Sequence, residues 1–166
     1  MNPDLRQDTQ EFLRNHFANK PLLRSLHIEI TSICNESCVH CYIPHEFKDH
    51  HMDLGLFNKI VDESIEMKVI NFTLTGGEPM LHPNFLEMIK RCKKENISLN
   101  ILSNLTALSE EIVTELKANP LIGIQVSLYS INPDIHDKIT KVKGICSLTK
   151  NAIRNVDDIN INLQIS

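Results

Sequence analysis

The segment Leu26–Cys41, with the sequence LHIEITSICNESCVHC, indicates both the fold and the chemistry of this chain. Its first five residues alternate apolar and polar side chains, which is typical of a half-buried β-strand. Three cysteines follow closely, at Cys34, Cys38 and Cys41. The sequence therefore predicts a strand over 26–30 that runs directly into a loop carrying three thiols.

Three thiols in one short loop indicate a metal centre. Cysteine thiolates hold the irons of iron–sulfur clusters, and most electron-transfer clusters use four of them. Three cysteines would bind three irons of a 4Fe–4S cube and leave the fourth iron open to a substrate or cofactor. A closed tetrahedral zinc site is the alternative, with a fourth ligand available at His40, His45, His50 or His51. Disulfides are disfavoured, because the chain has five cysteines and no signal peptide.

The spacing of the cysteines, three residues and then two, resembles the CxxxCxxC loop of the radical S-adenosylmethionine (radical SAM) superfamily. The run Thr75-Gly76-Gly77-Glu78-Pro79 resembles the GGEP motif that follows the second strand in that family. The resemblance implies that the three cysteines hold a 4Fe–4S cluster and that SAM chelates its open iron. It also implies an enzyme in which the reduced cluster passes an electron to SAM, breaking a carbon–sulfur bond and releasing a 5′-deoxyadenosyl radical. An electron donor such as flavodoxin or ferredoxin would be its partner.

The Gly-Gly-Glu-Pro run is expected to bind the amino end of SAM. Gly76 and Gly77 allow the backbone to approach a ligand closely, and Pro79 fixes the exit of the turn. The carboxylate of Glu78 would accept a hydrogen bond from the α-ammonium of SAM. Taken alone, the same run would be an ordinary strand-to-helix turn with a solvated glutamate.

Other SAM contacts are expected by the same resemblance. His40 occupies the position where the family usually has an aromatic residue beside the adenine, and Tyr42 is expected next to the cluster or the base. In the family, polar residues at the ends of the third and fourth strands contact the ribose and carboxylate of SAM. The residues at those places are Ser103, Asn104, Gln125 and Ser127. The alternatives are an ordinary turn for the first pair and polar groups facing the barrel interior for the second.

Strand-like and helix-like segments alternate along the rest of the chain. Strand patterns continue at residues 69–74, 97–102, 121–128 and 159–165, with helical periodicity between them. Strands separated by helices imply right-handed βαβ units and a parallel sheet, which binds ligands at the C-terminal ends of its strands. The predicted fold class is α/β, a partial (β/α)6 TIM-like barrel of the radical SAM type, truncated after about five strands.

Two further runs resemble the peptide and protein maturases of this superfamily that carry a C-terminal SPASM or twitch extension. They are Ile28–Tyr42, and Val126–Ser130 followed by His136-Asp137 and Lys143-Gly144. That branch usually has Gly-Ser-Phe where this chain has Gly144-Ile145-Cys146. The resemblance implies a peptide or protein substrate, although related branches act on cofactor precursors and other small molecules. His136-Asp137 is interpreted as part of a structural turn rather than as a catalytic dyad.

Composition limits the partners. The chain has 166 residues, 42% of them hydrophobic, and suits one globular domain. No stretch approaches the roughly eighteen apolar residues of a membrane span, and a net charge of −4 with dispersed basic residues disfavours nucleic acid. Free thiolates favour a cytoplasmic, reducing location. Cys92 lies on the apolar face of a predicted helix and, like Cys146, is not expected to bind metal.

The domain organisation predicted is an N-terminal helical extension over residues 1–24 and a radical SAM core over residues 25–166. The core lacks a sixth βα unit and any C-terminal extension, so we expect an N-terminal fragment. Two classes of function stay open: a radical SAM enzyme acting on a peptide or a cofactor precursor, and a non-catalytic iron–sulfur or zinc-binding module. The intact Gly76–Pro79 run favours the enzyme, because a pure metal module does not need it.

Overall fold

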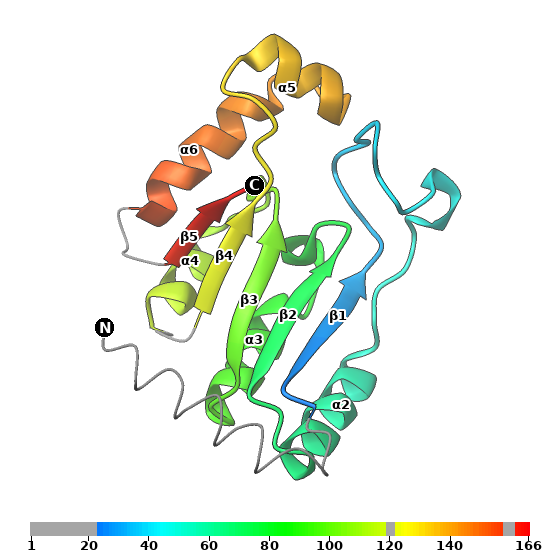
Figure 1. The fold of residues 1–166 in the computed structure, drawn as a ribbon, viewed down its shortest axis with the longest axis vertical. Coiled ribbons are helices and arrows are strands. Elements are labelled where there is room, and N and C mark those ends of the chain that lie inside the picture. The colour runs from blue at the N-terminus through cyan, green and yellow to red at the C-terminus, as the bar shows by residue number, and fades with distance from the viewer. Residues whose placement is uncertain (1–22, 119–121, 158–161) are drawn as a thin grey trace, which may run out of the picture.

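The structure, a computed structural model, describes residues 23–118, 122–157 and 162–166. Its centre is one sheet in the order β1-β2-β3-β4-β5, with every neighbouring pair parallel (Figure 1). The strands are β1 (Ser25–Thr31), β2 (Asn71–Gly76), β3 (Ser98–Ser103), β4 (Ile122–Val126) and β5 (Asn162–Ile165). The predicted α/β class, with an open parallel sheet, is therefore confirmed. The expected N-terminal extension lies almost wholly outside the described residues, as does the first half of the fifth predicted strand.

Helices connect the strands in the order that the periodicity predicts. They are α2 (Leu54–Glu66), α3 (Phe85–Lys94), α4 (Glu110–Lys117), α5 (Pro133–Thr140) and α6 (Ile145–Asp157), with short 3-10 turns η1 (His45–Phe47) and η2 (Pro79–Leu81). Side-chain caps begin α2 and α4, because Asp53 accepts from the N–H of Leu56 and Ser109 from that of Ile112. None of these described helices is both long and apolar enough to cross a bilayer.

Helix α5 was not anticipated, because His136-Asp137 was interpreted as part of a turn. The helix begins with Asn132 as its cap and Pro133 in its first turn, and it ends at Lys141 in a left-handed conformation with φ of 58°. Both ends are typical helix boundaries, and the turn interpretation gave too little weight to the cap at Asn132 and to Pro133. His136 and Asp137 therefore lie on a helix and not in a turn.

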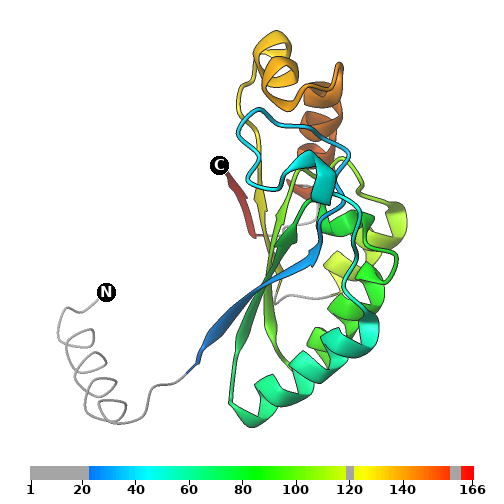
Figure 2. The same cartoon turned by 90° about the vertical axis from the view of Figure 1, so that its right-hand side faces the viewer.

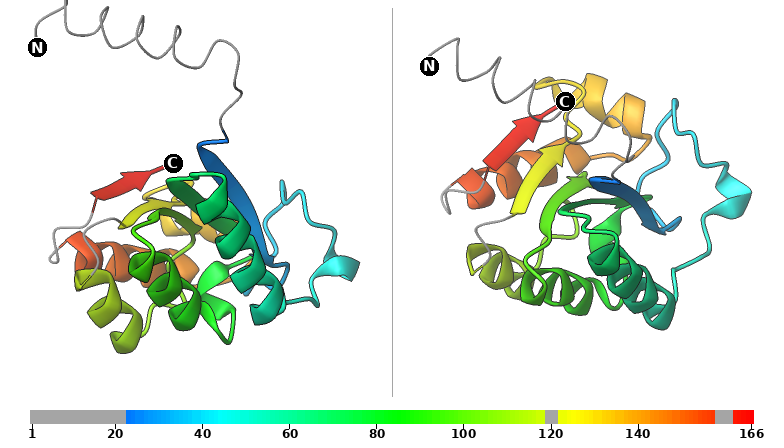
Figure 3. Two further views of the ribbon diagram at one scale, coloured as in Figure 1. Left: turned by 90° about the horizontal axis from the view of Figure 1, so that it is seen from below. Right: turned by 60° about the horizontal axis from the view of Figure 1, so that its bottom comes forward.

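The helices α2, α3, α4 and α6 form an arc along one side of the sheet (Figures 2 and 3). The core lies between that side of the sheet and the helices, and includes Phe57, Phe72, Leu74, Met88, Ile101 and Ile124, all nearly or fully buried. Along β3 and β4 buried residues alternate with half-buried ones, so the second face of the sheet lines the inside of an open barrel. No described helix covers that inner face (Figure 2).

Every strand points toward the same edge of the sheet. The cysteine-bearing chain, the turn after β2 and helix α5 all gather at this edge (Figure 1). In parallel α/β sheets this is where ligands bind. The fold therefore brings together the motifs that the sequence keeps apart.

Candidate functional site

A pocket of about 240 Å³ opens at the C-terminal edge of the sheet. It is formed by the cysteine loop (residues 32–52), the turn after β2, the end of β3 and the residues after β4. Most residues that were expected to bind the cluster or SAM line it: Cys34, Cys38, His40, Cys41, Tyr42, Gly76, Gly77, Ser103, Asn104 and Ser127. Its lining also includes Glu36, Lys48, Thr75, Leu102 and Tyr129.

The three cysteines of the pocket are held by hydrogen bonds within the loop, two of them through their sulfur atoms. The Cys34 sulfur accepts a hydrogen bond from the N–H of Glu36 at 3.4 Å, and the N–H of Cys41 donates to the carbonyl of Cys38 at 3.1 Å. The Cys38 thiol donates to Glu36 Oε2 at 3.3 Å. Burial raises the pKa of Cys34, and burial together with Glu36 raises the pKa of Cys38 to about 12. Both thiols therefore keep their protons near neutral pH until a metal displaces them.

The two glycines after β2 are needed by the chain that leads to the cysteines. Gly77 N donates to the Thr31 carbonyl and Glu78 N to the Ile33 carbonyl, each at 2.8 Å. A Cβ on Gly76 would lie 2.0 Å from the Thr31 oxygen, and one on Gly77 would lie 2.2 Å from the Ile33 oxygen. Gly76 also has a φ of 128°, which favours glycine. The sequence predicted glycines for close approach to a ligand, whereas their missing side chains make room for the backbone before Cys34.

Glu78 lies beneath the pocket and not in its lining. Its side chain is fully buried, and both oxygens have protein partners. Oε1 accepts from the Ser103 hydroxyl at 2.8 Å and the Met80 N–H at 3.0 Å, and Oε2 accepts from the Asn104 N–H at 2.7 Å. The expected direct contact with an ammonium group does not fit this placement. Burial raises the pKa of Glu78 to about 7, although the three hydrogen bonds act to lower it.

A chain of polar side chains extends from Glu78 to the cysteine loop. Asn104, whose backbone is held by Glu78, donates from Nδ2 to Asn35 Oδ1 at 3.0 Å. Asn35 in turn donates to the Thr106 hydroxyl at 2.6 Å, and Thr106 donates from its N–H and hydroxyl to Asn104 Oδ1. The residue after Cys34 is therefore fastened to the end of β3 by side chains alone.

Comparison with known families accounts for this arrangement. A family model for the Radical SAM superfamily matches residues 28–165, most of the chain. The chain belongs to the radical SAM superfamily.

Several curated radical SAM relatives match most of this chain. It is 30% identical over 139 residues to a tungsten-containing aldehyde ferredoxin oxidoreductase cofactor-modifying protein of Pyrococcus furiosus, covering 81% of this chain and 38% of that one. It is 32% identical over 141 residues to a probable GTP 3′,8-cyclase of Methanocaldococcus jannaschii, covering 84% and 47%. The antilisterial bacteriocin subtilosin biosynthesis protein AlbA of Bacillus subtilis is 29% identical over 140 residues, covering 83% and 31%. The chain spans less than half of the length of each of these relatives.

The fold also matches solved structures. The crystal structure of Streptococcus suis SuiB bound to its precursor peptide SuiA superposes with a TM-score of 0.79 at 15% identity, covering 99% of this chain and 38% of that one. At this identity the likeness concerns the fold. The partial radical SAM barrel is thereby confirmed.

The donor set of the pocket fits the 4Fe–4S cluster of the superfamily. In a cube each cysteine binds a different iron, so three thiols can be spread along one pocket wall. A single zinc ion instead needs its ligands gathered around one point. Among the described residues no three His, Cys, Asp or Glu side chains are gathered in this way. The residues that would hold the cluster are Cys34, Cys38 and Cys41, whereas Cys92 and Cys146 are buried elsewhere.

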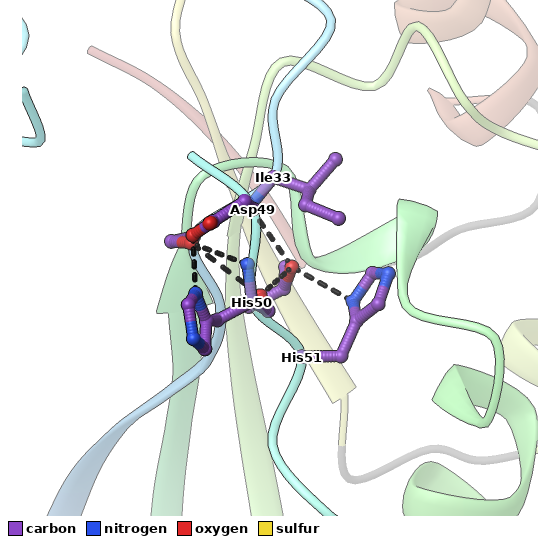
Figure 4. Close-up of polar contacts among 6 residues, drawn as sticks. Ile33, Asp49, His50 and His51 are labelled. Atoms are coloured by element: carbon purple, nitrogen blue, oxygen red, sulfur yellow. Dashed lines mark hydrogen bonds and ion pairs between the residues drawn. The ribbon is translucent and has the colours of Figure 1, made fainter. Parts of the chain in front are cut away.

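The radical SAM cysteine loop is closed at its base by a strap, residues 49–52. The N–H of Ser32 donates to the His50 carbonyl at 2.9 Å, and the N–H of Met52 donates to the Ile30 carbonyl at 2.8 Å. Figure 4 shows the side-chain contacts at this base. The Thr31 hydroxyl lies 2.9 Å from His51 Nδ1 and 3.1 Å from the His50 carbonyl, and it accepts from the N–H of Ile33 at 3.0 Å. The two ends of the loop are thus fixed although much of it is exposed.

Besides Glu78, two expected contacts lie outside the pocket lining. Pro79 is buried and starts η2, so it shapes the turn without reaching the cavity. Gln125 lies on the half-buried inner face of β4, which matches the alternative of a polar group facing the barrel interior.

Sequence reasoning missed three pocket residues that contact the cysteine loop. Glu36 lies between two of the cysteines and is 4% exposed. Lys48 donates from Nζ to the Glu36 carbonyl at 3.0 Å. Tyr129 follows Ser127 by two residues, and an alternating pattern at the end of β4 would have pointed both toward the same side.

Proposed function

We propose that this chain is the catalytic core of a radical SAM enzyme that holds a 4Fe–4S cluster through Cys34, Cys38 and Cys41. One observation carries the proposal: the three thiols, the Gly76-Gly77 turn and the ends of β3 and β4 meet in one pocket. With both cofactors bound, the chemistry supplied is one-electron cleavage of SAM to methionine and a 5′-deoxyadenosyl radical. The chain's own residues place the two cofactors.

The pocket residues divide into those that would touch SAM and those that hold them. His40, Tyr42 and Ser127 line the cavity, and so does Ser103, whose hydroxyl is bound to Glu78. Gly76 and Gly77 present backbone to the same space. Glu78 supports these residues without lining the cavity, because it binds the Ser103 hydroxyl and the Asn104 backbone N–H. Its contribution to SAM binding is the position of these groups rather than a contact of its own.

For the whole protein we propose a peptide or protein substrate. The names of AlbA and of the SuiB–SuiA complex support this choice, because they describe bacteriocin biosynthesis and a bound precursor peptide. A cofactor precursor is the second candidate, favoured by the relatives at 30% and 32% identity, one named a cofactor-modifying protein and the other a probable GTP 3′,8-cyclase. Deuterium appearing in 5′-deoxyadenosine from a deuterated precursor peptide, rather than from a deuterated nucleotide, would distinguish the two.

A one-electron donor such as flavodoxin or ferredoxin is proposed as the redox partner, in a reducing cytoplasm. The support is chemical: all five cysteines are free thiols, a state that reducing compartments maintain. Reduction of the chain's cluster by purified flavodoxin, followed spectroscopically, tests this partner.

The deciding experiment is anaerobic reconstitution of the chain with iron and sulfide. We expect about four irons per chain and, after reduction, an electron paramagnetic resonance (EPR) spectrum that changes when SAM is added. Dithionite should then drive formation of 5′-deoxyadenosine. Two results would support the non-catalytic metal module instead. The chain could take up one zinc ion and no cluster, or its cluster could give the same spectrum with and without SAM.

A further inference from the structure

Helix α5 fastens the cysteine loop on both sides of Cys38. The N–H of Ser37 donates to the Thr140 carbonyl at 3.0 Å, and the N–H of Val39 donates to the Ile139 carbonyl at 2.9 Å. Both carbonyls belong to the last turn of α5, where a helix leaves such groups without partners of its own. The second cysteine is thus held by a helix far from it in sequence.

The ring of Tyr129 lies beside the same cysteine. It makes an edge contact with His40 at 4.8 Å between ring centroids and stacks on His136 at 5.6 Å with 27° between the planes. Tyr129 lines the pocket together with Cys38 and Ser127, and its hydroxyl interacts with both of these side chains. Tyr129 therefore connects the cysteine loop, the end of β4 and α5.

His136 supports this ring from behind. It is fully buried, and neither of its ring nitrogens has a hydrogen-bond partner among the described residues. A buried imidazole without partners serves here as a flat packing surface, and burial lowers its pKa, which keeps it neutral. Beside it, Asp137 accepts from the N–H groups of Cys146, at 3.0 Å, and Gly144. This carboxylate ties α5 to the beginning of α6.

We propose that Tyr129 is a positioning residue for the cluster, which hydrogen-bonds the Cys38 sulfur while His136 holds its ring in place. The inference rests on the proposed function, because it requires Cys38 to bind iron. It gives His136 and Asp137 a role in supporting the cluster site and no part in the reaction itself.

Loss of the thiol proton decides which neighbour of Cys38 can stay bound to it. The free thiol donates to Glu36 Oε2, but an iron-bound thiolate has no proton to donate and can only accept. The Tyr129 hydroxyl is a phenol, which carries its proton at neutral pH and can donate to that thiolate. Hydrogen bonds to cluster sulfurs and their ligands stabilise the reduced, more negative state and raise the reduction potential. Tyr129 would therefore make the cluster easier to reduce.

The test compares Tyr129→Phe with Thr114→Val, which also removes one hydroxyl group. Thr114 lies outside the pocket lining, and its hydroxyl donates to the Glu110 carbonyl within α4. Each reconstituted variant is analysed for iron, and its midpoint potential is measured by EPR-monitored titration without SAM. We expect Tyr129→Phe to keep its iron and to shift to a more negative potential, with Thr114→Val at the wild-type value. A full cluster in Tyr129→Phe at an unchanged potential overturns the proposal, whereas loss of iron with unchanged circular dichroism supports it more strongly.

A second pair of variants tests the support behind the ring. His136→Ala removes the stacking surface and should shift the potential in the same direction as Tyr129→Phe, whereas His136→Phe restores a flat ring and should return it toward wild type. A wild-type potential in His136→Ala would overturn the role given to this residue. Wild-type protein that binds no cluster would instead refute the proposed function, so the two failures are distinguishable.

Discussion

The two sides of the pocket are built in opposite ways. The floor consists of the turn after β2 and the end of β3, joined through the fully buried Glu78 and its three hydrogen bonds. The cysteine loop opposite is largely exposed, with Val39 at 62% and Tyr42 at 66%. It is fixed by backbone hydrogen bonds to the strap, to α5 and to the turn after β2, and by the Asn35 side chain at the end of β3. The floor is held by buried hydrogen bonds among its own groups, whereas the loop is held at a few points and carries its thiols in the pocket.

This difference separates the two cofactors in physical terms. Residues of the floor gain their positions from the sheet, so SAM would meet groups that are already arranged. The thiols gain their final positions when metal replaces their protons, because metal binding supplies free energy that orders its ligands. Changes in the loop should therefore alter cluster content, and changes in the floor should alter SAM affinity and stability.

The largest effect is expected from removing a thiol of the loop. Cys34→Ala, Cys38→Ala or Cys41→Ala should reduce reconstituted iron from about four per chain to nearly none, because the cube loses a ligand. Iron and sulfide analysis and the ultraviolet–visible spectrum measure this. The controls are Cys92→Ala and Cys146→Ala, which should keep the cluster. A complete cluster in Cys38→Ala would show that the ligands have been assigned wrongly.

The next effect concerns the floor. Glu78→Ala leaves the N–H groups of Met80 and Asn104 buried without an acceptor, which costs on the order of 1–3 kcal/mol for each group. We expect a lower urea midpoint and a SAM dissociation constant that rises by roughly 10-fold or more. The iron content should stay near that of wild type. Equilibrium dialysis of SAM on the reconstituted protein measures the second effect. A wild-type urea midpoint in the variant would mean that Glu78 does not hold the floor.

The raised pKa of Glu78 gives the floor a pH dependence. Its folded pKa of about 7 lies above its ordinary value of 4.5, so the native state binds this proton more tightly than the unfolded state. The stabilisation that this proton gives the folded state is fully present below pH 4.5 and is lost as the pH rises to about 7. At about 1.4 kcal/mol for each pKa unit, the loss is roughly 3 kcal/mol.

Urea unfolding of wild type and Glu78→Gln at several pH values isolates this contribution. Glutamine cannot titrate, so the wild-type unfolding free energy should fall relative to that of the variant between pH 5 and pH 7. Other groups that titrate in this range are shared by both proteins and cancel in the difference. Parallel curves for the two proteins would contradict the buried carboxylate as its source.

Sequence reasoning predicted the strands, most helices and the three cysteines, because these depend on local periodicity and on spacing within one loop. It predicted that glycine was required at Gly76 and Gly77 but not which atoms would fill the space. For Glu78 it identified an acceptor for positive charge. Whether the side chain turns toward the cavity or beneath it depends on the end of β3, which local sequence does not show.

The contacts between Tyr129, α5 and the cysteine loop could not be predicted from the sequence, for a related reason. They join segments that are distant in sequence, and the residues of α5 were interpreted as part of a turn. Backbone carbonyls of Ile139 and Thr140 carry part of the interaction, so side-chain identity gives no sign of it. The sequence predicted which residues bear the chemistry, and the structure adds which residues hold them.

The smallest effect is expected at the base of the loop, in Thr31→Val. Thr31 is 3% exposed, and its hydroxyl accepts from the N–H of Ile33 and contacts the strap at His50 and His51. Valine keeps the shape but leaves that N–H without its acceptor, at a cost of about 1–2 kcal/mol. The amides of Ser32 and Met52, which bind across the base, should exchange with deuterium faster by roughly the same free energy, and floor amides such as Asn104 should not. Thr31→Ser retains the hydroxyl and should exchange like wild type. If the amides of the floor and of the loop base instead accelerate together in Thr31→Val, the two sides of the pocket open as one unit and the contrast between them does not hold.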